Sequence, residues 1–362
     1  MRRHWIDNLR WVTVLLVLFY HVIYYYNNKG VVGGIGGFGD GPQYQDVVMY
    51  ILYPWFMPLL FILAGVSARY ALERQTAKEW FRVRTLKLLV PSTIGLLFFG
   101  FLTGFFNSLT APTDAISALP LPIKYLIWTI SGTGPLWFIQ VLWLLSLLLL
   151  VVRRLDARDR AWTACSKIGA VPLVLLGGLF WLGEKTLIMN PDPAGIGGLW
   201  NLYKPLFYVI PFMMGYFIFS HDRTQQMLER MWRPMMACAV VSGVVLTVTT
   251  FGENNTLPEY LGSPLNNLYG YLMCLAMMGW FRSRFDRTGV FATYMTRSSY
   301  GIYIVHYLVV NSLGYTLRMA TQLPALWCYI ILTVAVFTLS PLLYELLRRI
   351  PFIRWSVLGE KR

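Results

Sequence analysis

The chain has 362 residues, of which 56% are hydrophobic and only 13% are charged. A soluble domain carries about 25% charged residues, so this composition excludes an ordinary soluble protein. The net charge of +14 would suit a nucleic-acid-binding protein, but the placement of the charges, described below, argues against that class.

Long apolar runs recur along the whole chain, and each is long enough to cross a bilayer as a helix. They predict an all-α integral membrane protein of about ten transmembrane helices, organised as a single domain over residues 1–362. The 14 Trp and 22 Tyr residues suit the aromatic belts of such proteins. The expected spans are 9–27, 46–70, 89–107, 134–152, 168–186, 203–220, 234–251, 264–281, 298–317 and 325–347.

The basic residues gather at one set of predicted helix ends. On this interpretation 26 of the 31 Lys and Arg residues lie at the two termini and in segments 69–88, 153–167, 221–233 and 282–297. Positive charge stays on the cytoplasmic side of a membrane, so both termini are expected there. This predicts a multi-pass protein of the cell membrane, in contact with lipid and not with nucleic acid. The opposite side holds only Lys29, Lys124, Lys185, Lys204 and Arg318.

The first apolar run places an arginine and a histidine on one helix face. Eleven residues make about three turns, so Arg10 and His21 share a face about 16 Å apart along the axis, with Asp7 near the same stripe. Arginine suits phosphate, and a neutral buried histidine suits proton transfer. The alternatives are that Arg10 only marks the cytoplasmic boundary and that His21 is a structural histidine hydrogen-bonded between helices.

The second span contains Pro54 and Pro58, which break the helical hydrogen-bond ladder and predict a kink or a re-entrant shape. Asp46 stands at its outer start and is the nearest carboxylate that could orient His21. Farther along, the sequence SGTGPLW at 131–137 predicts a broken helix start that lines a cavity, with Trp137 in its wall.

A basic stretch, KEWFRVRTLKLLVP at 78–91, follows the second span and is predicted to be a short amphipathic segment on the cytoplasmic side. Arg84 and Lys87 are three residues apart and therefore share a helical face. Together with Arg82 they would bind a diphosphate or a 3′-phosphate. The alternative is that these charges anchor the segment to anionic lipid headgroups.

The segment SSYGIYIVHY at 298–307 carries Tyr300, Tyr303 and His306 at intervals of three residues, so these side chains are expected to face inward. His306 would lie near the middle of the membrane, where it could approach His21. The alternative is a packed Tyr–His pair without a chemical role. No Cys, His or carboxylate spacing predicts a metal site.

Taken in order, R-x10-H (Arg10 and His21), FILAG, the basic run before Pro91, PLWFIQVL and SYGIYIVHY resemble the acyltransferase 3 family of membrane O-acyltransferases. IDNLRW, FILAGVSARY and EWFRVRTLKLLVP are similar to its glucan succinyltransferase branch. The resemblance covers essentially the whole chain. It implies that Arg10 is the first-helix arginine of the family and that His21 is its essential histidine. Arg84 and Lys87 would be its basic pair, whose second member is often arginine.

The resemblance also implies a reaction. An acyl group, acetyl or succinyl, would move from cytoplasmic acyl-CoA to a hydroxyl of an extracytoplasmic carbohydrate or other envelope acceptor, with acyl-CoA as substrate and no permanently bound cofactor. CoA phosphates would bind Arg84, Lys87 and Arg10, and His21 would act as base or as transient acyl carrier. Two other classes stay open: a transporter or flippase, and a non-catalytic sensor or scaffold.

Overall fold

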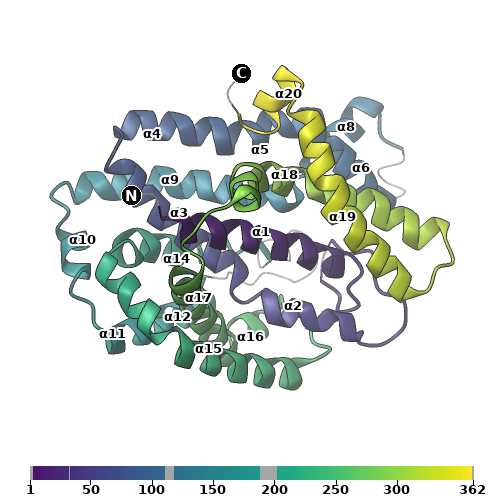
Figure 1. Ribbon diagram of the computed structural model, residues 1–362. Coiled ribbons are helices and arrows are strands. Elements are labelled where there is room, and N and C mark those ends of the chain that lie inside the picture. Colours follow the sequence, from purple (N-terminus) through teal and green to yellow (C-terminus); the bar gives the residue numbers. More distant parts are fainter. Residues whose placement is uncertain (1–2, 32, 111–117, 188–201, 361–362) are drawn as a thin grey trace.

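The computed structural model describes residues 3–31, 33–110, 118–187 and 202–360, and within these ranges the regular structure is helical, with no strand (Figure 1). Seven helical segments in the described residues are long and apolar enough to cross a membrane. They confirm an all-α, multi-pass membrane protein. They are His4–Tyr25, Tyr44–Leu72, Ala77–Thr110, Gly134–Leu155, Ala170–Leu187, Asp222–Thr250 and Ala325–Leu347.

The other three expected spans are also helical in the structure. Residues 203–220 contain the shorter apolar helix Val209–Phe219. Helices α17 (Pro264–Arg284) and α18 (Val290–Ala320) cover the remaining two. The buried positions of α18 include the polar residues Ser298, Ser299 and Asn311, which makes it an inner helix of the bundle. The total of ten crossings and the side of each terminus stay predictions.

The helices have the following bounds. The first half contains α1 (His4–Tyr25), α2 (Val47–Leu52), α3 (Phe56–Leu72), α4 (Ala77–Arg84), α5 (Val90–Gly95), α6 (Phe101–Thr110), α8 (Leu121–Ser131), α9 (Trp137–Leu155), α10 (Arg160–Cys165), α11 (Ala170–Leu175) and α12 (Gly177–Leu187). The second half contains α14 (Val209–Met214), α15 (Asp222–Thr250), α16 (Pro258–Leu261), α17 (Pro264–Arg284), α18 (Val290–Ala320), α19 (Ala325–Leu347) and α20 (Pro351–Ser356).

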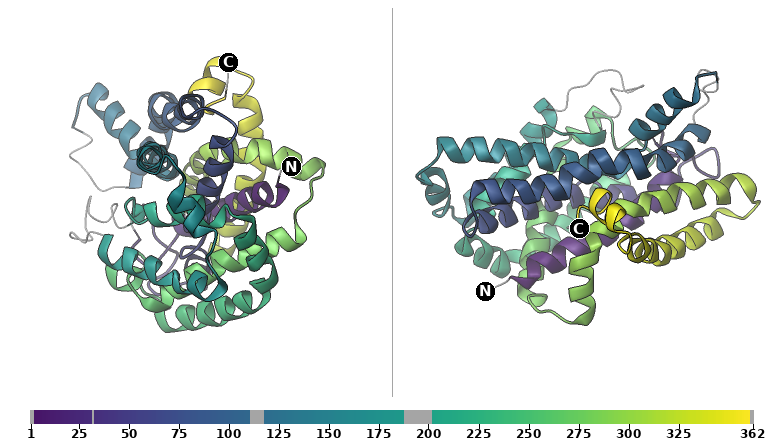
Figure 2. Two further views of the ribbon diagram at one scale, coloured as in Figure 1. Left: turned by 90° about the vertical axis from the view of Figure 1, so that its left-hand side faces the viewer. Right: turned by 90° about the horizontal axis from the view of Figure 1, so that it is seen from above.

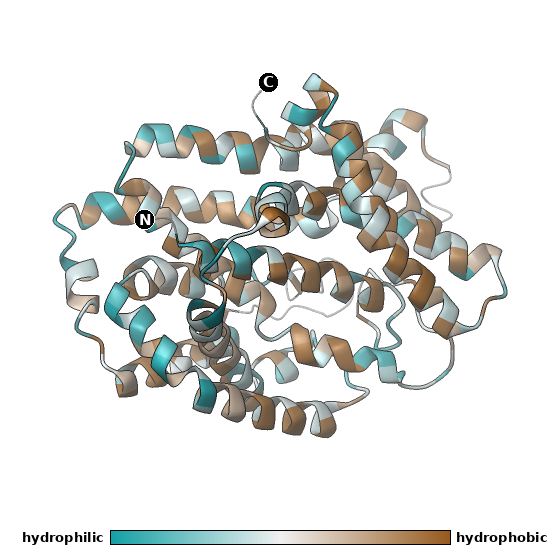
Figure 3. Ribbon diagram, viewed as in Figure 1, coloured by the Kyte–Doolittle hydropathy of each residue, from teal (hydrophilic) through white to brown (hydrophobic). Residues whose placement is uncertain are grey.

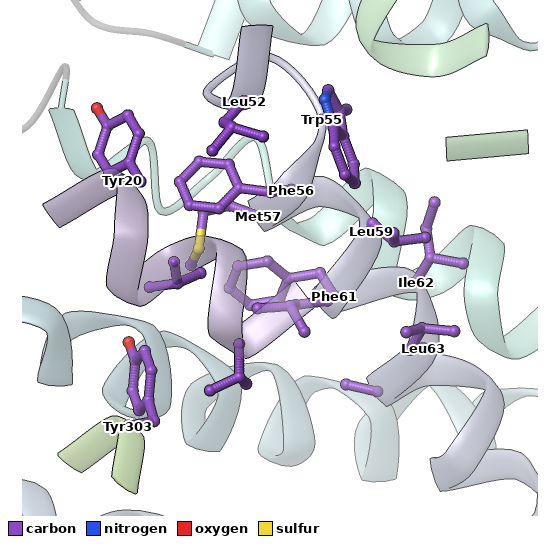
Figure 4. Packing of buried hydrophobic residues seen from close by; sticks show 14 of the residues in the cluster. Tyr20, Leu52, Trp55, Phe56, Met57, Leu59, Phe61, Ile62, Leu63 and Tyr303 are labelled. Atoms are coloured by element: carbon purple, nitrogen blue, oxygen red, sulfur yellow. The ribbon is translucent and has the colours of Figure 1, made fainter. Parts of the chain in front are cut away.

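Helix α1 lies in the middle of the bundle and contacts α3, α17, α18 and α19 (Figure 1). Helices α18 and α19 lie side by side, as do α15 and α17 (Figure 2). The buried core contains many aromatic rings among its aliphatic side chains. Figure 4 shows Phe56, Met57 and Phe61 of α3 in the buried cluster that also contains Tyr20 of α1 and Tyr303 of α18. The site residues of α1 are therefore held by neighbours that come from distant parts of the chain.

Hydrophobic residues recur along the outer helices of the bundle (Figure 3). On α15, Val240, Val244 and Val248 are spaced four residues apart and all three are exposed. On α19, Ile330 and Val334 are likewise exposed. Exposed apolar stripes at helical spacing are the surfaces that lipid covers in a membrane protein.

The expected break in the second span is confirmed, because α2 ends at Leu52 and α3 begins at Phe56, with Pro54 in the turn between them. Two other expectations are corrected. The stretch 108–133, which lies between two expected spans and is therefore expected to be an outer loop, contains α8, whose apolar residues pack on α6. The basic stretch at 78–91 is not separate from the third span, because the chain is helical without interruption from Ala77 to Thr110.

Two glycines fix how α3 is placed. A Cβ atom on Gly65, in the FILAG motif, would lie 2.1 Å from the carbonyl oxygen of Phe212. A Cβ on Gly215 would lie 2.2 Å from the carbonyl oxygen of Ile62. Only glycine permits this backbone approach, as is common where helices cross closely in membranes.

Candidate active site

One face of α1 lines two neighbouring cavities. Arg10 and Val14 line a cavity of about 420 Å³, called here the basic cavity. Val17 and His21 line a cavity of about 750 Å³, called here the histidine cavity. Tyr303 of α18 is the one described residue that lines both. The helical period thus places an arginine in one cavity and a histidine in the next.

A second histidine holds His21 in place. His21 Nδ1 lies 2.8 Å from the carbonyl oxygen of Val17 and 3.2 Å from Nε2 of His306. His306 is fully buried, and its Nδ1 lies 2.6 Å from the carbonyl oxygen of Tyr303. A carbonyl oxygen can only accept, so both histidines carry their hydrogen on Nδ1 when neutral; this assignment follows from the hydrogen-bond network.

The consequence is a defined orientation of the His21 ring. Both hydrogen-bond contacts found for this ring among the described residues use Nδ1. The unprotonated Nε2 is left for the cavity that His21 lines. The ring is also held edge to face against Tyr307 and Tyr24, with centroid distances of 5.2 and 5.9 Å. An imidazole fixed in this way can accept a proton from a hydroxyl in the cavity.

The wall of the histidine cavity is rich in aromatic rings. Trp137 stacks on Tyr203 with a centroid distance of 5.2 Å and an interplanar angle of 19°. The broken helix start predicted at 131–137 forms this wall, because Ser131, Thr133, Gly134 and Pro135 all line the cavity beside Trp137. Rings with hydroxyl groups at their edges suit the apolar faces and polar rims of a carbohydrate.

The basic cavity collects cationic side chains from three helical segments. Arg10 donates hydrogen bonds to Ser67 Oγ at 2.7 Å and to Asp7 Oδ1 at 3.2 Å. Arg84 of α4 lines the same cavity beside Trp80, and its guanidinium carbon lies 5.1 Å from the Trp80 ring. The third segment is the start of α18, which contributes Arg297. Clustered guanidinium groups bind phosphate oxygens well.

Lys87 also lines the basic cavity, in the π-helical turn Thr85–Leu89. The hydroxyl of Tyr300 donates a hydrogen bond to the Lys87 carbonyl oxygen, so α18 holds this turn in place. The chain near its C-terminal end closes the other side: Gly359, at φ +62°, packs against Leu86 and Lys87, and the carboxylate of Glu360 accepts a hydrogen bond from Tyr344. The π-turn places Lys87 toward a ligand site, where such turns often occur.

Three of the predicted site residues lie elsewhere than expected. Arg82 is exposed on α4, outside the lining of either cavity. Asp7 lines neither cavity; it holds Arg10 and borders a separate hollow of about 300 Å³. Asp46 accepts a hydrogen bond from the Asn28 backbone at 3.2 Å. The side chain hydrogen-bonded to His21 is that of His306 and not that of Asp46, which the sequence favoured as the carboxylate that orients His21.

Asp46 belongs to a buried charge cluster with Lys29. The Lys29 ammonium group lies 3.4 Å from the centre of the Tyr50 ring. Burial lowers the pKa of Lys29 to about 7, and the neighbouring Asp46 carboxylate opposes the shift. These residues follow α1 in the chain, and neither Lys29 nor Asp46 lines the histidine cavity.

Several residues of the site were not singled out from the sequence. They are Tyr20, Tyr24, Tyr53, Tyr203 and Tyr307 of the histidine cavity and Arg297 of the basic cavity. The signal for Arg297 was its position three residues before Tyr300, on the same helical face. The tyrosines carried no such signal in a chain with 22 of them. The sequence of the outer loops also suggests Trp200, Asn201, Asn254 and Asn255 as contacts for the acceptor; the first two lie outside the described residues.

Over the described ranges, no group of three or more His, Cys, Asp or Glu side chains is arranged to hold a metal ion. The described site offers a histidine pair, phenol groups and guanidinium groups.

The comparison with protein families agrees with this geometry. A family model, that of the acyltransferase 3 family and described as an acyltransferase domain, matches residues 3–345. The chain belongs to this family and is a membrane acyltransferase. No curated protein and no solved structure gives a match. The resemblance to the glucan succinyltransferase branch stays a prediction.

Proposed function

We propose that this protein is an O-acyltransferase of the cell membrane, which moves an acyl group from cytoplasmic acyl-CoA to a hydroxyl of an extracytoplasmic carbohydrate or other envelope acceptor. One observation carries the proposal: a single face of α1 presents Arg10 to the basic cavity and His21 to the histidine cavity, with Tyr303 at their common wall. Acyl-CoA has the matching form, with phosphates at one end and a thioester at the other.

The donor would bind through its phosphates in the basic cavity. Arg10, Arg84, Lys87 and Arg297 line it, and the ring of Trp80 offers a surface for the adenine. Arg10 and His21 are about 16 Å apart along the helix, which is about the reach of the pantetheine arm. The thioester would therefore arrive at His21 while the phosphates stay with the cations.

The arm would have to pass Tyr303. This side chain is buried, donates a hydrogen bond to the Pro135 carbonyl oxygen and packs against Phe138 at a centroid distance of 5.9 Å. Donor binding would displace the ring and open the two cavities to each other. Closure of the ring in the absence of donor would keep water in the histidine cavity from reaching the basic cavity.

The reaction would then proceed at His21. The acceptor hydroxyl gives its proton to Nε2 while its oxygen attacks the thioester carbonyl carbon. The C–S bond breaks, the ester forms, and the proton passes from Nε2 to the thiolate sulfur of CoA, so no net proton is gained or lost. His306 would hold the hydrogen of His21 on Nδ1 and so keep Nε2 available as the base.

The proposal is tested with the purified protein in liposomes, radiolabelled acetyl-CoA and a neutral glucose oligosaccharide as the probe acceptor. We expect release of free CoA and appearance of label as an alkali-labile ester on the oligosaccharide. Absence of both acyl-CoA binding and CoA release would contradict the proposal and favour the transporter class. Binding of acyl-CoA and release of free CoA without an ester on the oligosaccharide would support the proposed donor and exclude this oligosaccharide as the acceptor.

A further inference from the structure

The side chains around His21 are uncharged. Among the described residues that line the histidine cavity there is no Asp, Glu, Lys or Arg. The polar groups there are the phenols of tyrosines such as Tyr24 and Tyr307, the amide of Asn107 and the hydroxyls of Ser131 and Thr133. The segments 111–117 and 188–201, which lie outside the described residues, contain no Lys or Arg in the sequence. No cation of these segments could complete the lining.

None of the five cations predicted for the outer side lines the histidine cavity. Lys204 is 2% exposed, and its ammonium group lies 2.5 Å from the carboxylate of Glu184, behind the Tyr53 ring. Lys204 is one of the five cations predicted for the side that contains the histidine cavity. Three others contact aromatic rings: Lys29 with Tyr50, Lys185 with Trp181 and Arg318 with Phe38. The fifth, Lys124, has an interaction partner of its own and does not line the cavity.

The two cavities thus differ in the charge they can accept. The basic cavity gathers Arg10, Arg84, Lys87 and Arg297 against one carboxylate, that of Glu360. The histidine cavity offers hydrogen bonds and rings but no countercharge among its described residues. A carboxylate held there would have no ion-pair partner among these residues, so the loss of its water against the ring-lined walls would not be repaid.

We infer that the enzyme transfers an uncharged acyl group and rejects acyl groups that carry a carboxylate. This inference rests on the proposed function, and it separates the two acyl groups that the sequence left open. In a succinyl thioester the carboxylate is only three carbon–carbon bonds from the reacting carbonyl carbon. When that carbon is within reach of His21 Nε2, the carboxylate must also lie in the uncharged cavity, out of reach of the cations that bind the CoA phosphates.

The test uses the wild-type protein and three donors: acetyl-CoA, succinyl-CoA and 4-methylpentanoyl-CoA. The third has the shape of succinyl-CoA, with an isopropyl group in place of the carboxylate. We expect kcat/KM for succinyl-CoA to be about 100-fold below that for 4-methylpentanoyl-CoA, as for a charge left without a partner. The His21→Ala protein gives the background rate for each donor.

Each outcome separates the inference from the proposed function. Equal or faster transfer from succinyl-CoA than from its neutral isostere would overturn the inference and leave the acyltransferase proposal intact. Equally poor transfer from both long donors, with rapid transfer from acetyl-CoA, would also overturn it, because size and not charge would then decide. Failure of all three donors to react would contradict the proposed function itself.

Discussion

The basic cavity and the histidine cavity lie on the same face of α1, yet they are built from different side chains. The first gathers four cationic residues from α1, α4, the turn after α4 and α18. The second is formed by tyrosines, Trp137 and small polar groups around one histidine. A charged ligand is recognised where arginines can hold phosphates. Proton transfer is placed where a neutral imidazole has a fixed tautomer.

Donor binding and proton transfer are thus assigned to separate cavities along one helix. This separation predicts that substitutions in the basic cavity change KM for acyl-CoA and that substitutions in the histidine cavity change kcat. Tyr303, common to both linings, marks the boundary. The following predictions test this division, in order of decreasing effect.

Replacing His21 removes the proposed base. We expect His21→Ala to lower kcat about 1,000-fold, the usual scale for loss of a general base. His4→Ala, on the same helix but outside both cavity linings, is the matched control and should keep kcat within about twofold. CoA release from radiolabelled acetyl-CoA measures both. Comparable rates for the two variants would exclude a catalytic role for His21.

Replacing His306 tests whether it positions His21. His306→Leu removes the acceptor at 3.2 Å from His21 Nδ1, and we expect kcat to fall about 30-fold with little change in KM. His306→Gln retains a hydrogen-bonding group at that place and should recover part of the loss. A purely structural role predicts that both variants lose folded protein instead, which size-exclusion chromatography of the purified proteins would reveal.

Two arginines of α4 provide a matched pair for the basic cavity. Arg84 lines the cavity, whereas Arg82 is exposed outside it. We expect Arg84→Gln to raise KM for acyl-CoA about 10-fold, the scale of one charge-assisted hydrogen bond, with kcat nearly unchanged. Arg82→Gln should leave both constants within about twofold. Steady-state kinetics over a range of acyl-CoA concentrations decides; equal effects of the two substitutions would show that α4 acts only through its overall charge.

Lys29 gives the smallest expected effect, on stability rather than activity. In the unfolded chain its ordinary pKa is about 10.4, whereas burial lowers the folded-state pKa to about 7. Between these values the unfolded state binds more protons, so this residue makes stability rise with pH from about 7 to 10. Below that window the charged Lys29 costs stability in the folded state.

Lys29→Met should therefore flatten the rise of Tm between pH 7 and 9.5 by about 2 °C relative to wild type. The exposed Lys185 offers the control substitution Lys185→Met, which should keep the wild-type slope. Thermal unfolding followed by intrinsic fluorescence in detergent measures all three proteins. An unchanged slope in Lys29→Met would mean that Lys29 is solvated in the folded protein.

Periodicity and composition predicted the parts of this account that depend on local sequence. The helical period placed Arg10 and His21 on one face of α1, and the two cavities lie along that face. Pro54 and Pro58 predicted the break between α2 and α3. These predictions needed only the geometry of a single helix.

The rest depends on how distant segments meet, which local patterns do not encode. The sequence predicted that His306 could approach His21, 285 residues away, but the contact between His306 Nε2 and His21 Nδ1 depends on the relative register of α1 and α18. The sequence pattern favoured Asp46 as the carboxylate that orients His21. The path of the chain after Tyr26 brings Asn28 and Lys29 to Asp46 instead. The helix α8 was missed because its flanking Pro and Gly residues are typical of loops.

The most direct test of the division between the two cavities is the affinity of the His21→Ala protein for CoA, measured by titration calorimetry beside wild type and Arg84→Gln. The account predicts a Kd within about twofold of wild type for His21→Ala and about 10-fold weaker binding for Arg84→Gln. A His21→Ala protein that is folded but binds CoA as weakly as Arg84→Gln would contradict it, because the histidine would then belong to the donor site rather than to the chemistry.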